Sequence, residues 1–558
     1  MDSLLLSICT KEKISEVIFL KQLKNSYVLN TRCFLLAFCF SALSFVSQND
    51  PQAQNSFINQ ETQQTIDQWD IKYPSLEFHS SFKPYISSTL QNFSDTSIHY
   101  AHYAIKNFFL SKTFNEGPTK RNQYSFQVLP LIDLQGGYDV LTSKLLLETI
   151  GGVHTKLNIN NDFTFALTAI GGKVSYPNFI DTTIHTTGLI PGLGRAFKNS
   201  DGSYGFSNVT GYVSYSPNKI FNFQAGKDKH FIGDGYRSLL LSDFSNSNPY
   251  VGINANIWRI QYNVWYSWMK DFSRYDGSQK SLQNKYGTFH YLSFNAFKEL
   301  NISFFENVVW QGTDTNRVRT FDVNYLNPIV FYRPQEYSVG SPDNSMMGLN
   351  FSAKLFGSLK IYAQAVADEF YLKEIRARKG WWANKQGWQF GAKYINAFKI
   401  KGLTMQVEYN QVRPYTYSHG SVQQNYANYG QPLAHPFGAN FKEYLGFLSY
   451  RANRWMISFQ GLSATIGMDT LNSNLGQNIF LSYTTRPYEY GHKTTQGNKR
   501  KLMQSDIKFT YYLIPQMNLR LEVGYIQRSM KDDLGYVLQS PYVYLGIKTS
   551  IHQFYRDY

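Results

Sequence analysis

Cysteine is missing from most of this chain, because its three cysteines, Cys9, Cys33 and Cys39, all lie within the first 39 residues. The rest of the chain therefore has no disulfide framework and no thiol nucleophile. The histidines of the predicted loops, such as His435, are isolated and lack the spacing of metal ligands. The sequence thus predicts neither a metal site nor a bound cofactor.

The motifs of common enzyme classes are also missing after residue 47. No Gly-x-Ser-x-Gly, phosphate loop or His-Glu-x-x-His occurs there. Asp368 and Glu369 are the one conspicuous carboxylate pair. Adjacent residues on a strand point to opposite faces, so the two are not expected to flank a glycosidic bond. We expect a lumen carboxylate paired with an arginine such as Arg333, and a protein that is not an enzyme.

Long apolar runs are absent as well. After residue 47 nothing approaches the ~20 apolar residues that a spanning helix needs. Mean hydropathy is −0.36, yet the chain has 42 Tyr and 42 Phe. This combination is typical of an outer-membrane β-barrel, in which lipid-facing and lumen-facing residues alternate. A large soluble β-sandwich or propeller is the alternative.

The order of segments predicts an exported protein. Arg32 precedes the apolar run of residues 33–46, and small and polar residues follow it, so residues 1–47 are predicted to be an extension and signal peptide cleaved near Ser44 or Ser47. A lipoprotein signal ending at Cys39 is disfavoured because Phe38 stands where a small residue is required. Residues 48–120 are predicted to be a periplasmic region, mostly irregular up to residue 92, with a helix over Ser97–Leu110.

Residues 121–558 are predicted to form the barrel. Between Val209 and Asp271, two hairpins with tight turns at Pro217 and Trp258 flank a long loop, as at the two ends of a membrane barrel. Further tight turns are expected near Lys298, Phe356, Phe398–Gly402, Ala452 and Pro515. Together with strands beginning at Tyr124, Lys144 and Phe163, they predict about 18 antiparallel strands with both termini in the periplasm. The aromatic terminus His552–Tyr558 is expected at the membrane interface.

Several segments resemble the Wzi family of capsule assembly outer-membrane proteins. They are GKDKHFIGDGYRSLLLS (226–242), LKIYAQAVADE (359–369), YLNPIVFYRP (325–334) and QVRPYTY (411–417). The likeness is closer to the Bacteroidetes branch, which includes the gliding-motility protein RemB. The resemblance implies an 18-stranded barrel with periplasmic helices, acting as a surface lectin that holds capsular polysaccharide. The branch implies a part in adhesion or gliding, with gliding or surface-export machinery as a further partner.

The candidate glycan-binding residues lie in the predicted loops. They are Asp234, Tyr236, Arg237, Arg333, Arg376, Lys379, Trp381, Trp382, Tyr415 and Tyr417. Guanidinium groups suit carboxylates and phosphates, and aromatic rings suit sugar faces. The alternatives are a loop folded on itself by Gly233 and Gly235, with Asp234 and Arg237 as an internal pair, and an interfacial girdle for the tryptophans.

The net charge of +15 suits surface polysaccharide or lipopolysaccharide as a partner beside the outer-membrane lipid. Nucleic acid is not expected, because the basic residues are scattered rather than gathered in a stripe. A porin or substrate channel is the alternative function, since a barrel of this size can enclose an aqueous lumen.

Overall fold

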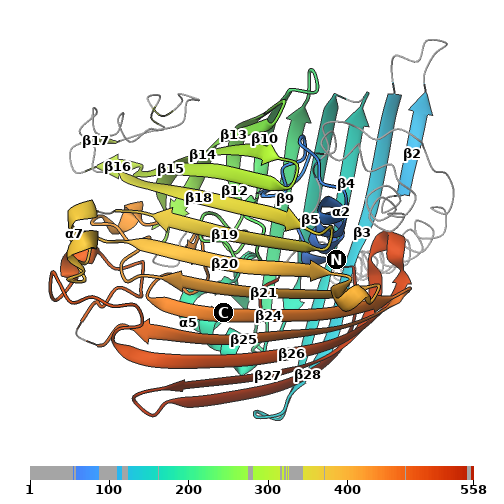
Figure 1. The fold of residues 1–558 in the computed structure, drawn as a ribbon. Coiled ribbons are helices and arrows are strands. Elements are labelled where there is room, and N and C mark those ends of the chain that lie inside the picture. Colours follow the sequence, from blue (N-terminus) through green and yellow to red (C-terminus); the bar gives the residue numbers. More distant parts are fainter. Residues whose placement is uncertain are drawn as a thin grey trace, which may run out of the picture.

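The computed structural model describes residues 55, 58–86, 110–115, 123–160, 162–273, 281–314, 317–318, 322, 325, 343–369, 371–471, 473–549 and 554–558. Eighteen strands form one closed antiparallel barrel (Figure 1). They are β3 (Gln123–Asp139), β4 (Lys144–Ile159), β5 (Phe163–Val174), β9 (Tyr204–Tyr215), β10 (Phe221–Asp228), β12 (Asn248–Ile257), β13 (Ile260–Asp271), β14 (Gln283–Phe297), β15 (Leu300–Gln311), β18 (Asn344–Leu355), β19 (Leu359–Ala367), β20 (Gln386–Ile395), β21 (Leu403–Val412), β24 (Phe441–Ala452), β25 (Trp455–Met468), β26 (Asn498–Ile514), β27 (Leu519–Asp532) and β28 (Val537–Lys548). The predicted fold class and strand number are confirmed.

Alternating side chains give the wall its two faces. On β20, Gln389 and Lys393 are buried in the lumen while Trp388 and Phe390 are exposed on the outer face. A strand turns successive side chains to opposite sides, so polar residues line the inside and apolar ones the outside. The barrel closes where β28 pairs with β3, with Tyr542 opposite Asp139.

The two ends of the barrel differ in their connections. One end carries only short turns, for example Trp258-Arg259 between β12 and β13, and Phe356–Ser358 between β18 and β19. The other end carries the long connections, including the one that contains α7 (Leu372–Ala377). Membrane barrels of this kind have short turns in the periplasm and long loops outside the cell. The end with α7 is therefore the outer end (Figure 1).

The chain also forms short strands and turns besides the barrel strands. They are β2 (Leu110–Asn115), which pairs with β3; β1 (Phe82–Lys83) with β11 (Phe231–Ile232); β6 (Leu189–Ile190) with β7 (Gly194–Arg195); β8 (Phe197–Lys198) with β9; β16 (Thr313–Asp314) with β17 (Arg317–Val318); β22 (Ala427–Asn428) with β23 (Gln431–Pro432); and the 3₁₀ turns η4 (Ala397–Lys399), η5 (Val422–Gln424), η6 (Tyr483–Thr485) and η7 (Pro515–Met517). No helix among the described residues is long and apolar enough to cross a membrane.

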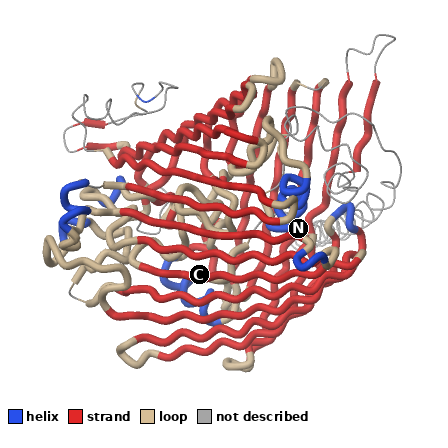
Figure 2. Tube along the Cα trace, viewed as in Figure 1, coloured by secondary structure: helices blue, strands red, loops and turns tan. Residues whose placement is uncertain are grey.

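The polar N-terminal region is more ordered than its sequence predicts. A helix, α2 (Gln60–Lys72), forms where irregular chain was expected, and Asn59 caps it by accepting a hydrogen bond from the Thr62 amide at 2.8 Å. The helix lies inside the barrel near the end with short turns (Figure 2). Asp70 forms an ion pair with the wall residue Lys354 at 2.5 Å. The helix predicted over Ser97–Leu110 falls outside the described residues, apart from Leu110 at the start of β2.

A second helix, α5 (Asn178–Thr187), also packs against the inner wall. Its apolar residues Phe179, Ile180 and Ile184 join one cluster with Leu129 of β3 and Ile150 of β4. Burial of these side chains against the wall supplies the apolar contact that such a short helix needs for stability. The connection between β5 and β9 thus fills part of the lumen.

The chain terminus corrects one sequence-based prediction. Residues 554–558 do not sit at the membrane interface but turn back into the barrel. Arg556 pairs with Glu148 of β4 at 2.7 Å, and Asp557 is buried beside Arg237. Two charged residues among the aromatic ones explain the difference, because each finds an opposite charge in the polar lumen and neither would find one at the lipid surface.

Candidate functional site

The connection between β10 and β12, residues 229–247, folds into the lumen, and we refer to it as the inner loop. Its strand β11 pairs with β1 of the N-terminal region. Gly233, at φ 132°, donates its backbone N–H to the Ser81 carbonyl at 2.7 Å. Such a φ is unfavourable for residues other than glycine. The inner loop is therefore held between the N-terminal segment and the wall.

Arg237 is the most connected residue of the inner loop. It is 1% exposed, and its guanidinium pairs with Glu443 of β24 at 3.2 Å and with Asp557 of the terminal segment at 3.1 Å. Its backbone N–H donates to Glu408 of β21 at 3.1 Å, as does that of Tyr236 at 2.7 Å. The arginine joins the loop, the wall and the chain terminus.

Asp234 is buried at a second junction. Its carboxylate pairs with Lys360 of β19 at 2.6 Å and accepts a hydrogen bond from Ser80 at 2.7 Å. Lys360 also lies 3.3 Å from Asp67 and 3.4 Å from Asp70 of α2. One alternative expected Asp234 and Arg237 to pair with each other. In the structure they do not. Each binds the wall and neither reaches solvent.

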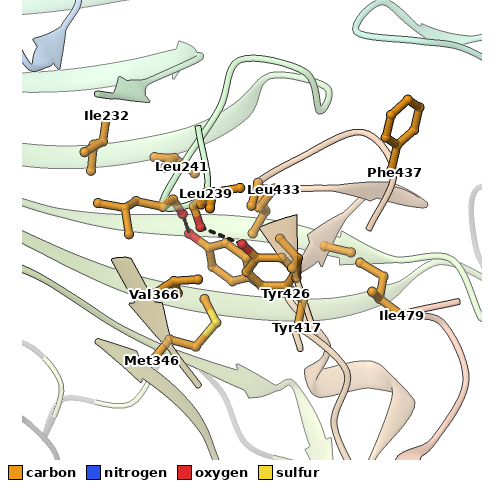
Figure 3. Packing of buried hydrophobic residues seen from close by; sticks show 14 of the residues in the cluster. Ile232, Leu239, Leu241, Met346, Val366, Tyr417, Tyr426, Leu433, Phe437 and Ile479 are labelled. Atoms are coloured by element: carbon orange, nitrogen blue, oxygen red, sulfur yellow. Dashed lines mark hydrogen bonds between the residues drawn. The ribbon is translucent and has the colours of Figure 1, made fainter. Parts of the chain in front are cut away.

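Two tyrosines of the connection between β21 and β24 close the inner loop from the outer side. Tyr417 donates its hydroxyl to the Leu239 carbonyl at 2.8 Å, and Tyr426 donates to the Leu240 carbonyl at 2.6 Å. The rings stack, with centroids 5.8 Å apart, among Ile232, Val366 and Leu433 (Figure 3). Tyr417 is therefore a buried anchor rather than an open sugar platform.

Above this packed interior, two outer loops form a cluster of aromatic and basic side chains. We define the outer patch as Tyr371, Arg376, Arg378, Lys379, Trp381, Arg486, Tyr488 and Tyr490. Backbone hydrogen bonds join the loops: Gly491 donates to the Lys379 carbonyl and His492 to the Gly380 carbonyl, each at 2.9 Å. Trp382 donates its backbone N–H to the Glu489 carbonyl at 3.0 Å. The patch thus rests on a fixed backbone frame.

The base of the outer patch is aromatic and buried. Trp382, 9% exposed, lies 4.7 Å from Tyr483 and 6.2 Å from Tyr415 between ring centroids. The Arg486 guanidinium covers the Trp382 ring at 4.0 Å, an arrangement that favours a cation over an indole face. Trp382 and Tyr415 support the patch from below.

The top of the outer patch is open. Tyr371, Tyr488 and Tyr490 are 55%, 44% and 47% exposed. Arg376, Arg378 and Lys379 are exposed, and Trp381 is half-buried beside Tyr371 with ring centroids 6.4 Å apart. Exposed guanidinium and ammonium groups beside exposed rings can pair with carboxylates or phosphates and stack on sugar faces.

Lys385 stabilises the frame beneath the patch. Its ammonium lies 3.3 Å from Asp368 and 3.1 Å from Glu369. Burial would lower the pKa of Lys385, and the two carboxylates raise it above its usual range instead. The adjacent carboxylates converge on one ammonium because both lie past the end of β19, where strand alternation no longer applies. Among the described residues their partner is this lysine, and Arg333, the arginine expected beside them, lies outside the described residues.

The histidines near the patch are neutral at physiological pH. Burial lowers the pKa of His419 to about 4, with the charge of Lys385 adding to the effect. Burial also lowers the pKa of His492, which stacks on Tyr488 at 4.5 Å. The positive charge of the outer patch therefore comes from arginine and lysine rather than from histidine.

The predicted site residues separate into three groups. Arg376, Lys379 and Trp381 lie together in the open part of the outer patch, with Trp382 and Tyr415 beneath them. Asp234, Tyr236, Arg237 and Tyr417 belong to the lumen packing. Arg333 lies outside the described residues.

The sequence-based reasoning missed Tyr371, Arg486, Tyr488 and Tyr490. The run RPYEY at 486–490 in a long loop carried the same basic-aromatic signal as RARKGWW at 376–382. No group of three or more histidine, cysteine or acidic residues in the described part of the chain is arranged to hold a metal ion.

Comparison with known proteins identifies the family. The family of capsule assembly protein Wzi matches residues 158–533 of this chain. The chain belongs to this family. As a Wzi-family protein it is an outer-membrane β-barrel of a capsule assembly family, not an enzyme. The match spans the inner loop and the whole outer patch.

One solved structure supports the fold, and two further ones align less closely. Wzi of Escherichia coli, described as an outer-membrane protein involved in group 1 capsule assembly and a carbohydrate-binding β-barrel, aligns with a TM-score of 0.56 at 11% identity, over 89% of this chain and 99% of that one. OprD of Pseudomonas aeruginosa aligns with a TM-score of 0.39 at 10% identity, over 76% and 94% of the two chains. OccAB2 of Acinetobacter baumannii also aligns with a TM-score of 0.39 at 10% identity, over 76% and 97%. No curated protein sequence matches the chain.

Proposed function

We propose that this Wzi-family barrel binds an anionic surface polysaccharide through its outer patch and so retains capsule on the cell. The observation that carries the proposal is the cluster of exposed cations and exposed rings on two loops joined by backbone hydrogen bonds. A fixed frame lowers the entropic cost of ordering the site when a flexible glycan binds. Carbohydrate binding by Escherichia coli Wzi supports the same class of ligand.

The filled lumen argues against a diffusion porin. In the described part of the chain, α2, α5, the inner loop and the terminal segment all lie inside the wall and are held by buried ion pairs and apolar contacts. Channels of this size instead leave a water-filled lumen. We therefore place polysaccharide binding first and transport second.

The finer parts of the proposal rest on the sequence. Export would use the signal peptide of residues 1–47. A role in adhesion or gliding, with gliding or surface-export machinery as a partner, rests on the motifs shared with the RemB branch. Adhesion and gliding would both be consequences of a surface protein that holds polysaccharide.

The binding test uses the purified full chain in detergent and the capsular polysaccharide of the same organism. We expect Arg376→Ala/Lys379→Ala to weaken binding about tenfold, because two exposed ion pairs with the glycan, each worth up to about 1 kcal/mol, are lost. Trp381→Ala should weaken it further through lost stacking. Biolayer interferometry with immobilised polysaccharide measures each affinity.

The matched control is Lys144→Ala/Lys198→Ala, which removes two exposed lysines at the same end of the barrel. It should leave the affinity unchanged. Equal losses in both double variants would mean that net charge and not the outer patch binds the glycan, and no loss in Arg376→Ala/Lys379→Ala would contradict the proposed site.

A further inference from the structure

The outer wall of β24–β27 carries lysines in a regular arrangement at the outer end. Lys442, Lys499, Lys501 and Lys531 face outward, since their sequence neighbours Glu443, Arg500 and Asp532 face the lumen and take part in ion pairs there. Lys499, Lys501 and Lys531 are exposed and Lys442 is half-buried. We refer to these four residues as the lysine stripe.

Strand register brings the stripe together. Lys442 stands opposite Thr465, Thr465 opposite Lys501, and Lys501 opposite Lys531. Lys499 follows on the same face of β26. Lys501 and Lys531 are directly opposite each other, and such side chains are about 5 Å apart at Cβ, where like charges destabilise the pair. The stripe therefore concentrates positive charge where the fold gains nothing from it.

Carboxylates do not neutralise the stripe. In the part of the chain that the structure describes, none of the four lysines lies within ion-pair distance of an acidic side chain. Asp533 stands beside Lys499, to whose carbonyl it donates its backbone N–H at 3.1 Å, but its exposed carboxylate forms no ion pair with the four lysines. An external anion is the remaining way to offset the repulsion.

An apolar band lies directly below the stripe. On β26 the outward residues toward the periplasm include Met503, Ile507 and Phe509, which are 62%, 49% and 46% exposed, with Ser505 between Met503 and Ile507. Trp455 and Tyr511 pack against each other at the lower edge, with ring centroids 4.2 Å apart and the rings tilted by 44°. Ten residues from Tyr511 to Lys501 span about 33 Å along the strand, or about 25 Å across the membrane at a tilt near 40°. This matches the height of the apolar band of membrane barrels.

We propose that the lysine stripe binds the phosphate groups of a phosphorylated glycolipid in the outer leaflet. The stripe lies where the acyl region ends and headgroups begin, and its ammonium groups are the point charges that phosphates attract. The bound lipid would cover β24–β27 below the outer patch. This inference does not rest on the proposed polysaccharide binding, because the stripe lies on the lipid-facing wall.

The test compares lipid A carrying two phosphates with fully dephosphorylated lipid A, each bound to the detergent-solubilised full chain and measured by native mass spectrometry. We expect Lys501→Gln/Lys531→Gln to weaken binding of the phosphorylated form roughly 25-fold at low ionic strength, about fivefold per lysine. Binding of the dephosphorylated form should not change. Lys501→Arg/Lys531→Arg should keep most of the affinity.

The control Lys399→Gln/Lys401→Gln removes two exposed lysines from the short-turn end and should leave lipid binding unchanged. Heat-modified gel migration confirms that each variant folds. An unchanged affinity in Lys501→Gln/Lys531→Gln, or equal losses for both lipids, would overturn the proposal. Loss of polysaccharide affinity with intact lipid affinity would assign the stripe to the glycan and overturn it equally.

Discussion

Arg237 shows how single charged residues hold the interior of this barrel together. Its guanidinium neutralises two buried carboxylates, Glu443 from the wall and Asp557 from the chain terminus. Burying such charges is costly unless they are paired, so the net gain from the pairs is small while the cost of breaking them is large. Arg237 acts as the shared partner of three segments that are far apart in sequence.

Replacing Arg237 by methionine should therefore destabilise the folded barrel by about 3–5 kcal/mol, the usual cost of leaving a buried charge without its partner. The temperature at which the folded band converts to the unfolded band in gel electrophoresis measures the effect. Adding Glu443→Gln to this variant should recover part of the loss. An unchanged transition temperature in Arg237→Met would show that the pairs do not hold the inner loop.

At this scale the sequence predicts residue chemistry better than residue position. The run GDGYR (233–237) carries charge and an aromatic ring, as a glycan site would. A loop has no periodicity to show whether it points into the lumen or out of the barrel, and only the partners Glu408, Glu443 and Lys360 decide. In contrast, Arg376 and Lys379 have no wall carboxylate beside them among the described residues and stay exposed.

At the scale of elements, α2 is the clearest case of a part held by charge. Asp67 and Asp70 face three wall lysines, Lys354, Lys360 and Lys393, at 2.5 to 3.4 Å. Asp67 and Asp70 are buried, as are the lysines. The helix has apolar contacts only through a few residues such as Ile66 and Trp69. Its position depends on these ion pairs.

We expect Asp67→Asn/Asp70→Asn to release α2 from the wall, because the buried ammonium groups of Lys354 and Lys393 lose their counter-charges and Lys360 keeps only Asp234. A loss of about 3 kcal/mol in the free energy of local opening corresponds to roughly 100-fold faster amide exchange over residues 60–72. Hydrogen–deuterium exchange with mass spectrometry measures this directly. Asp201→Asn removes only the exposed pair with Lys173 at 2.5 Å and should leave exchange in α2 unchanged. Equal exchange in all three proteins would contradict the role of the pairs.

Elements were predictable where a repeating pattern exists. The strands follow from alternation, as in Leu403–Val412, and the turns from Pro217, Trp258 and Phe356. The helix α2 was missed because its segment QETQQTIDQWDIK is polar and reads as solvent-exposed chain. In a polar lumen a buried helix is itself polar, so hydrophobic periodicity gives little signal.

At the scale of the whole molecule, the barrel is a filled support that presents loops. Eighteen strands enclose the N-terminal segment, α5, the inner loop and the chain terminus (Figure 2). Strand number follows from counting turns in the sequence. The packing of the lumen cannot be predicted in this way, because it depends on contacts between segments separated by hundreds of residues, such as Arg556 with Glu148. This packed interior fixes the frame on which the outer patch rests.

The central claim is that the outer patch holds polysaccharide at the cell surface, and the most direct measurement separates cell-associated from shed polysaccharide in a deletion strain. The strain is complemented with the wild-type chain, with Arg376→Ala/Lys379→Ala, or with Lys144→Ala/Lys198→Ala. The account predicts that deletion moves polysaccharide into the medium without reducing its total, and that the wild-type and Lys144→Ala/Lys198→Ala chains restore retention while Arg376→Ala/Lys379→Ala does not. An unchanged distribution after deletion, or full retention with Arg376→Ala/Lys379→Ala, would contradict it.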